Sequence, residues 1–360
     1  MRRILIIVVI AAQAGVLAWM AAGREWILRR GERFLVRSAG ADPQDPMRGA
    51  YARLQFELSN VDRSLWRDGL PTLVGASLRD SRSLADTPVF ASLRVNDSGL
   101  AVLAGLSDRR PAQGPFVRGR IESVSGDIVH VRYGIEAMFM EQDAATKFDQ
   151  ERARLRPGAP MDVEIAVSSD GTAVLRGVQW ESLGLVATFE RDPVPPANPP
   201  NPPGPGNRPR IVPPRQFIAR VRLEWKNYGD KEIAIAIQNN AGLLRLVPNV
   251  RASQNHYRWV GEGLPPARVE AASIIVLPPG GSHVETLDLT QPAWFVIDKK
   301  ARPDSAKPIA LRDVTDPWAA SFRIEYVPPS RTEVAALPHA DRMAFSSLVT
   351  RAFSSVVGGD

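Results

Sequence analysis

The sequence predicts a mainly β protein in which two antiparallel β domains follow an N-terminal transmembrane helix. Three observations support this prediction. Nineteen uncharged residues, Ile4–Ala22, follow Arg2 and Arg3. Apolar and polar residues then alternate in many short runs, which is the period of half-buried strands. Between two such regions lies a tract, residues 191–214, in which eleven of twenty-four residues are proline.

The uncharged run Ile4–Ala22 is long enough to cross a bilayer, because a spanning helix needs ~20 apolar residues. A cleaved secretion signal is the alternative, but its apolar stretch is usually about 7–15 residues long and ends at a small-x-small site. Here Ala21 and Gly23 form only an imperfect site of that kind. Trp19 and Trp26 suit the headgroup region, where amphipathic rings settle. We therefore expect residues 1–23 to be an uncleaved anchor in the lipid bilayer.

Arginines lie on both sides of the anchor, so the positive charge that marks the cytoplasmic side gives no clear orientation. We expect the short N-terminal tail to stay in the cytoplasm, which places the body outside it in a single-pass topology. The net charge of +6 is spread along alternating runs rather than in a Lys/Arg block, which predicts no nucleic-acid partner. The chain has no cysteine, which excludes disulfides, thiol catalysis and Cys-ligated metals.

Residues 24–190 are predicted to form the first antiparallel β domain. Ala52–Leu58 alternates apolar and polar residues, as a half-buried strand does. Gly126 and Gly171 lie in Ser-Gly-Asp and Asp-Gly turns between alternating runs. These turns are hairpin signals because glycine accepts a positive φ. One helix is expected near residues 144–155, before a Pro-Gly pair.

Two local motifs stand out in this region. The first, at 42–56, reads DPQDPMRGAYARLQF, and the second, at 131–136, reads VRYGIE. In this order behind the anchor, they resemble the GDYXXLXY family of membrane-anchored bacterial proteins, named for Gly-Asp-Tyr-x-x-Leu-x-Tyr. The resemblance covers about residues 4–180. Ala50 replaces the family's Asp, and Phe56 replaces its last Tyr, which fits a packing role.

The resemblance implies an extracytoplasmic β domain at the bacterial inner membrane, beside an integral membrane or envelope protein, and it supplies no reaction. The motifs give the first candidate binding residues. Arg48 and Glu136 form either a structural ion pair or a polar contact site for a partner. Gly49 suits a turn before a strand, and Tyr51 suits the core or the rim of a site. We favour the structural interpretation, because charged pairs near turns only sometimes mark a site.

Residues 215–335 are predicted to form the second β domain. Short alternating strands separated by turn residues suggest a β-sandwich of immunoglobulin-like type. Trp259, Trp294 and Trp318 lie near expected loops or strand ends. If they are exposed, they could stack on a glycan or bind a protein. If they are buried, they belong to the core, which is the commoner position for Trp.

The proline-rich tract 191–214 and the C-terminal segment 336–360 complete the organisation. Prolines lack a backbone donor and fix φ, so we expect the tract to extend as a polyproline II spacer between the two domains. The C-terminal segment has apolar residues at helical spacing, which predicts a short amphipathic helix. That stripe contains Phe345, Leu348, Val349, Ala352 and Val356.

No constellation typical of an active site is evident. His283 and Glu285 put two ligand types on one strand face, but a metal site usually needs three or four ligands. The other histidines, His130, His256 and His339, are far apart in the sequence. Phosphate-binding loops, nucleophile elbows and HExxH motifs are missing from the sequence. We assign no catalytic residue, metal or cofactor and favour a non-enzymatic role.

Three functions fit these observations. The first is a membrane-anchored, extracytoplasmic scaffold or interaction protein of the bacterial envelope that presents two β domains to a partner. The second is a carbohydrate- or peptidoglycan-binding module that uses exposed Trp side chains. The third is a hydrolase whose site is assembled from residues distant in the sequence.

Overall fold

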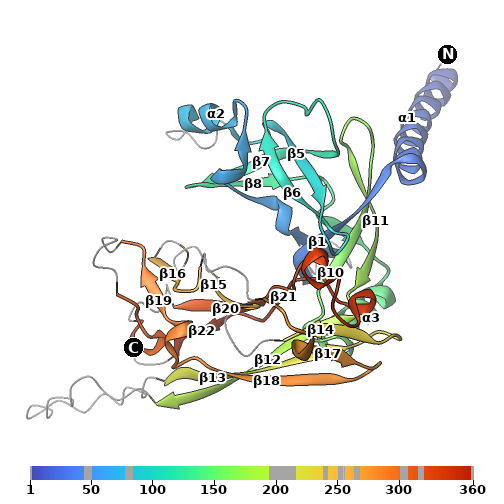
Figure 1. Cartoon of the computed structure of the whole chain (residues 1–360). Helices are drawn as coiled ribbons and strands as arrows, with labels where there is room; N and C mark the ends of the chain where they lie inside the picture. Colours follow the sequence, from blue (N-terminus) through green and yellow to red (C-terminus); the bar gives the residue numbers. More distant parts are fainter. Residues whose placement is uncertain are drawn as a thin grey trace, which may run out of the picture. The chain divides into compact units, whose positions relative to one another are not determined.

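The computed structural model in Figure 1 divides the chain into two compact units. Unit 1 comprises residues 1–153 and 160–180, and unit 2 comprises residues 154–159 and 181–360. Strands dominate both units behind one long N-terminal helix, which confirms the prediction of a mainly β protein. The structure describes residues 2–43, 51–77, 84–193, 216–237, 242–249, 254, 256–262, 268–300, 307–314 and 320–357.

The N-terminal helix, α1 (Arg2–Arg30), carries the predicted membrane segment (Figure 1). It is long and apolar enough to cross a membrane, and 0% of its most apolar window is buried in the protein. The helix continues one to two turns beyond the predicted anchor. It ends at Gly31, whose N–H donates to the carbonyl of Ile27 at 2.7 Å. A Cβ at Gly31 would lie 3.0 Å from the backbone of Val167, so glycine permits the close approach of α1 to the sheet.

The first sheet of unit 1 has five antiparallel strands in the order β11-β10-β1-β2-β9. The predicted hairpin at Gly171 joins β10 to β11, with φ +84° at the glycine. The strands are β1 (Glu32–Pro43), β2 (Tyr51–Phe56), β9 (Ala137–Phe139), β10 (Met161–Val167) and β11 (Ala173–Trp180).

The second sheet of unit 1 has six strands in the order β3-β8-β7-β5-β6-β4, antiparallel except for the β4–β6 pair. The predicted turn at Gly126 joins β7 to β8. The expected helix near 144–155 is α3 (Gln142–Gln150), continued by a π-helix to Leu155. The remaining elements are β3 (Asn60–Asp62), β4 (Trp66–Arg67), α2 (Leu70–Ser77), β5 (Pro88–Val95), β6 (Ala101–Ser107), β7 (Phe116–Ser125) and β8 (Ile128–Arg132).

Both sheets of unit 1 contribute to one apolar core. Val36 and Phe56 from the first sheet and Val89 and Ile121 from the second are at most 1% exposed and belong to the same cluster. The alternation that predicts strands thus also selects the inward-facing residues. Burial of such a cluster is the main source of stability for a β domain of this kind.

Unit 2 is a set of antiparallel strands around a second core. One sheet has the order β12-β13-β18, and another has β15-β20-β21, where β21 is Leu348–Val349. The strands β14–β17 and β16–β19 form two separate pairs. Trp225 is fully buried, with its ring edge-on to Tyr326 at 5.8 Å. The strands are β12 (Leu183–Pro193), β13 (Gln216–Asn227), β14 (Ile233–Ala236), β15 (Leu244–Pro248), β16 (Tyr257–Trp259), β17 (Ile274–Leu277), β18 (Ser282–Asp288), β19 (Val296–Asp298) and β20 (Ser321–Tyr326). The immunoglobulin-like assignment stays a prediction.

The proline-rich tract does not divide the units as predicted. The main part of unit 2 already starts at Glu181, ahead of the tract, and β12 and β13 pair from Leu183↔Asn227 to Pro193↔Gln216. The tract therefore connects two hydrogen-bonded strands of a single unit, and the last described residue before the gap, Pro193, pairs with the first one after it, Gln216. Residues 194–215 themselves lie outside the described part of the chain. The alternating apolar residues of 183–189 belong to the strand ladder of unit 2 rather than to the first domain.

The predicted C-terminal amphipathic helix is wrong. A short helix, α5 (Arg331–Val334), ends before the segment, which contains one 3-10 turn (Ala340–Arg342) and then three two-residue strands. The backbone of Thr350 donates to Ile324 at 2.9 Å, and the Thr350 hydroxyl accepts from Ile324 N–H at 3.0 Å, so edge pairing with β20 replaces helical hydrogen bonds. The short strands are β21 (Leu348–Val349), β22 (Phe353–Ser354) and β23 (Val356–Val357).

Candidate functional site

The two sequence motifs of unit 1 meet at one polar groove of about 660 Å³. Strand β2 forms one wall, and the second motif forms the other. The N–H of Leu54 donates to the carbonyl of Glu136 at 2.7 Å, and Arg53 pairs with Ala137 in the β2–β9 ladder. Backbone hydrogen bonds thus hold together two segments that are about eighty residues apart in the sequence.

Charged side chains of both signs line this groove. Arg53 lies 3.9 Å from Glu122, and the His130 Nδ1 atom is 2.8 Å from the Asn60 side-chain oxygen. Arg132 also lines the groove and pairs with Asp86 at 3.1 Å. Exposed pairs like these contribute little to stability, roughly 0–1 kcal/mol each. They can therefore be exchanged for contacts with a charged or polar partner at small cost.

Glu136 has a structural task within this site. Its two carboxylate oxygens accept the backbone N–H groups of Tyr133 at 2.5 Å and Gly134 at 2.8 Å. Gly134 adopts φ +82°, a backbone conformation that favours glycine. The carboxylate therefore closes the tight turn of the second motif.

The buried side chain of Tyr133 holds the same turn against the core. Its side chain is buried, and its hydroxyl donates to the carbonyl of Leu58 at 2.8 Å. Burial raises the pKa of Tyr133 well above its usual range, and the nearby Glu136 charge raises it further. The ring lies against Gly119 on β7, where a Cβ would come within 3.0 Å of it. The phenol is therefore a neutral packing group in this site.

Comparison with known families now identifies this region. Residues 13–178 match the family model described as GDYXXLXY protein. Unit 1 belongs to the GDYXXLXY family. The match ends two residues before the boundary between the units at Trp180. No curated protein and no solved structure matches the chain significantly.

Within the GDYXXLXY domain, the first motif contributes mostly to packing. Leu54 is 1% exposed and Phe56 is 0% exposed, so the ring at the last motif position fills the core. Tyr51 begins β2, and its backbone pairs with Phe139. Arg48 and Gly49 lie outside the described residues, so the proposed Arg48–Glu136 contact stays a prediction.

Sequence reasoning missed Gly119 and Tyr133 as a pair that shapes the GDYXXLXY domain. Tyr133 is visible in the second motif. Its ring can be buried only because the residue fourteen positions earlier, Gly119, has no side chain in the way. A glycine within the alternating run 116–124 was the available signal, because glycine in a strand often marks a close approach.

Of the two alternatives for the tryptophans of unit 2, Trp259 and Trp294 fit the buried one, which the sequence favours, rather than an exposed binding surface. Trp259 is 4% exposed and Trp294 is 5% exposed, and their rings stack at 6.1 Å between centroids. The Trp259 indole N–H donates to the carbonyl of Ala293 at 2.7 Å. These two side chains are core residues and cannot stack on a glycan in this conformation. Trp318 lies outside the described residues.

The described histidines do not come together into a site. His283 and Glu285 are paired at 2.8 Å on β18, as their spacing predicts, and His130 contacts Asn60. Across the described ranges, no group of three or more His, Asp or Glu side chains could hold a metal ion. The groove of the GDYXXLXY domain is lined by charged side chains of both signs, among them Arg53, Glu122 and Arg132.

Proposed function

We propose that this protein is a single-pass membrane protein of the bacterial envelope whose β units lie outside the cytoplasm and bind an envelope partner. The observation that carries the proposal is the exposure of α1. Ile7, Leu17 and Trp19 are 66%, 68% and 82% exposed, on a helix that is apolar on every face. A helix that is hydrophobic all round needs an apolar environment, and a bilayer supplies one.

The family of unit 1 supports the orientation. The GDYXXLXY resemblance implies a domain outside the cytoplasm, and the body follows α1 directly through Gly31 and β1. In this topology, both β units are on the same side of the membrane, because α1 is the one candidate membrane span in the described part of the chain.

The groove of the GDYXXLXY domain is the contact surface we propose for the partner. It is lined by charged side chains of both signs, including Arg53, Glu122 and Arg132, with apolar walls from β2 and β8. The nearby groups that resemble catalytic ones, Glu136 and Tyr133, are already engaged in backbone contacts. These features favour recognition of a polar protein surface over catalysis.

The membrane part of the proposal is tested by reporter fusions at the C-terminus. A phosphatase that is active only in the periplasm and a fluorescent protein that matures only in the cytoplasm are fused separately. We expect phosphatase activity without fluorescence, and retention of the protein in carbonate-washed membranes. Fluorescence without phosphatase activity would overturn the orientation.

The partner surface is tested by photo-crosslinking in cells. A photoreactive amino acid replaces Gln55, which is exposed and lines the groove. The matched control is Val95, which is 59% exposed on β5 and does not line it. We expect Gln55 to crosslink to one envelope protein and Val95 to give no such product. Identical products at both positions would argue against the groove.

A further inference from the structure

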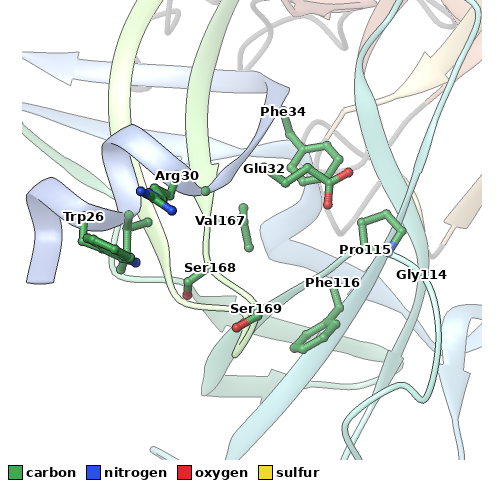
Figure 2. A pocket seen from close by; sticks show the side chains of 12 residues that line it. Trp26, Arg30, Glu32, Phe34, Gly114, Pro115, Phe116, Val167, Ser168 and Ser169 are labelled. Carbon is green, nitrogen blue, oxygen red and sulfur yellow. The ribbon is translucent and has the colours of Figure 1, made fainter.

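A second cavity, of about 410 Å³, lies where α1 meets the GDYXXLXY domain (Figure 2). Three segments enclose it: the last turns of α1 with the start of β1, the loop before β7, and the turn between β10 and β11. Its volume falls within the ~300–1,000 Å³ that is usual for small-molecule sites. The cavity lies at the C-terminal end of α1, the candidate membrane span.

If α1 inserts as proposed, helix geometry gives the level of this cavity relative to the bilayer. At ~1.5 Å per residue, the helix from Ile4 to Trp26 rises ~33 Å, which is close to the ~30 Å hydrocarbon core. Trp26 then lies at the headgroup level on the side of the body. Trp26 also lines the cavity, so the cavity opens at the depth of the lipid phosphates.

Two charged side chains of opposite sign line the cavity. The Arg30 guanidinium lies 4.6 Å from the centre of the Trp26 ring. Figure 2 shows the Glu32 carboxylate on the side of Pro115, away from Arg30. Among the described residues, neither Arg30 nor Glu32 forms an ion pair with another side chain. Both charges remain available for a ligand.

The other walls match the remainder of a phospholipid. Trp26 and Ile27 form an apolar wall on the α1 side, where the glycerol and the first acyl carbons would lie. Ser169 brings a hydroxyl from the β10–β11 turn. Arg110 donates to the Ser169 carbonyl at 2.8 Å, with its guanidinium 5.3 Å from the centre of the Phe116 ring, and so adds positive charge beside the cavity.

We propose that this cavity binds the headgroup of one phosphatidylethanolamine molecule, with the phosphate at Arg30 and Ser169 and the ammonium at Glu32. A zwitterionic headgroup carries one negative and one positive group, and the cavity wall carries one side chain of each sign, Arg30 and Glu32. Phosphatidylglycerol would satisfy Arg30 but would leave the Glu32 carboxylate without a cation. The cavity therefore distinguishes two phospholipids that share the same phosphodiester.

Native mass spectrometry of the full-length protein in detergent tests this proposal. The protein is incubated with equal amounts of phosphatidylethanolamine and phosphatidylglycerol that carry the same acyl chains. We expect a preference for phosphatidylethanolamine of about two- to fivefold, the range of one partly exposed ion pair. Glycerophosphoethanolamine, which has the headgroup without the chains, should compete only weakly if the lipid rather than a free phosphate compound is the ligand.

Three variants connect the preference to the residues. Glu32→Gln should abolish the preference while keeping binding of both lipids, and Arg30→Gln should weaken both. Arg24→Gln removes an exposed charge of α1 outside the cavity and should change neither. Equal binding of the two lipids by the unmodified protein, or an unchanged preference in Glu32→Gln, would overturn the proposal.

The outcome for this site is separable from the outcome for the anchor. If α1 does not insert, the protein appears in the soluble fraction without detergent, and both proposals fail. If the protein stays in washed membranes but shows no lipid preference, the headgroup site alone is refuted.

Discussion

At the scale of single residues, unit 1 contains a buried ion pair where its first sheet is most enclosed. The Arg37 Nε atom lies 2.5 Å from the Asp162 carboxylate, and their side chains are 8% and 2% exposed. Removal of Arg37 takes this ion pair away from the buried Asp162 carboxylate, whereas removal of both side chains leaves neither buried charge in place. We expect Arg37→Met to lower the free energy of unfolding by ~3–5 kcal/mol and Arg37→Met/Asp162→Leu to lower it much less.

Chemical unfolding of the protein in mild detergent, followed by tryptophan fluorescence, measures this difference. Arg63→Met is the matched control, because its ion pair with Asp127 is 67% and 69% exposed. The control should change stability by less than ~0.5 kcal/mol. A double variant as unstable as Arg37→Met would show that the loss of stability comes from the lost attraction between the two side chains, and not from the buried charge left by the single substitution.

Gly119 gives a second test of packing at the residue scale. A Cβ there would lie 2.5 Å from Val131 Cγ1 and 3.0 Å from the Tyr133 ring. Overpacking of this kind typically costs ~1–3 kcal/mol, so Gly119→Ala should lower the melting temperature. Gly177→Ala on β11 is the control, because nothing lies within 4 Å of its Cβ position. Equal melting temperatures for the two variants would show that β7 and β8 can move apart.

Asp170 makes the stability of unit 1 depend on acid pH. Hydrogen bonds from the Ser168 hydroxyl and then from Thr172 hold the pKa of Asp170 below its usual range. A group with a depressed pKa stabilises the fold above its unfolded pKa of ~3.9, and the stabilisation is lost as the pH falls through the folded pKa. Asp170→Asn should therefore melt earlier than the unmodified protein at neutral pH, and the gap should close below pH ~4. A gap that is independent of pH would contradict this.

At the scale of elements, we expect α1 to contribute membrane attachment rather than stability. Its apolar side chains are exposed along the helix, and only its last turn approaches β10 through Gly31. Deletion of residues 2–23 should move the protein to the soluble fraction and leave the melting temperature of the β units nearly unchanged. Fractionation and circular dichroism measure the two effects. Persistence of the shortened protein in washed membranes would point to another membrane contact.

The elements also show what the sequence could predict. The hairpins at Gly126 and Gly171 follow from local chemistry, because a turn with positive φ requires glycine at the observed place. The C-terminal segment could not be predicted in this way. Its stripe of Leu348 and Val356 fits a helix, but Thr350 instead joins the edge of β20, and edge pairing depends on tertiary neighbours.

The sequence shows the two motifs that line the candidate site, but it does not show which residues come together in space. The two motifs were visible in the sequence, and Phe56 was expected to pack, as it does. The tryptophans of unit 2 illustrate the limit, because burial of Trp259 depends on the partner strand β19 and on stacking with Trp294. Pattern alone places such residues near strand ends and does not say on which side of the sheet they lie.

At the scale of the whole molecule, the proline-rich tract lies inside unit 2 and does not mark the boundary between the units. Composition alone makes residues 191–214 a linker, because prolines interrupt strands. The β12–β13 ladder contradicts this, since eleven residues of β12 pair with β13 across the tract. Cleavage within the tract distinguishes a spacer between two domains from a connection inside unit 2.

A protease site inserted after Pro202 provides that test in isolated membranes. We expect the C-terminal fragment to stay with the membrane-anchored fragment after cleavage, because β12 on one side of the cut pairs with β13 on the other. Urea at a concentration that unfolds unit 2 should then release it. A spacer between independent modules would instead release the C-terminal fragment into the wash as soon as the tract is cut. Quantification of the fragment in wash and membrane, before and after urea, separates the two arrangements, since a strand ladder fails only when the unit that contains it unfolds.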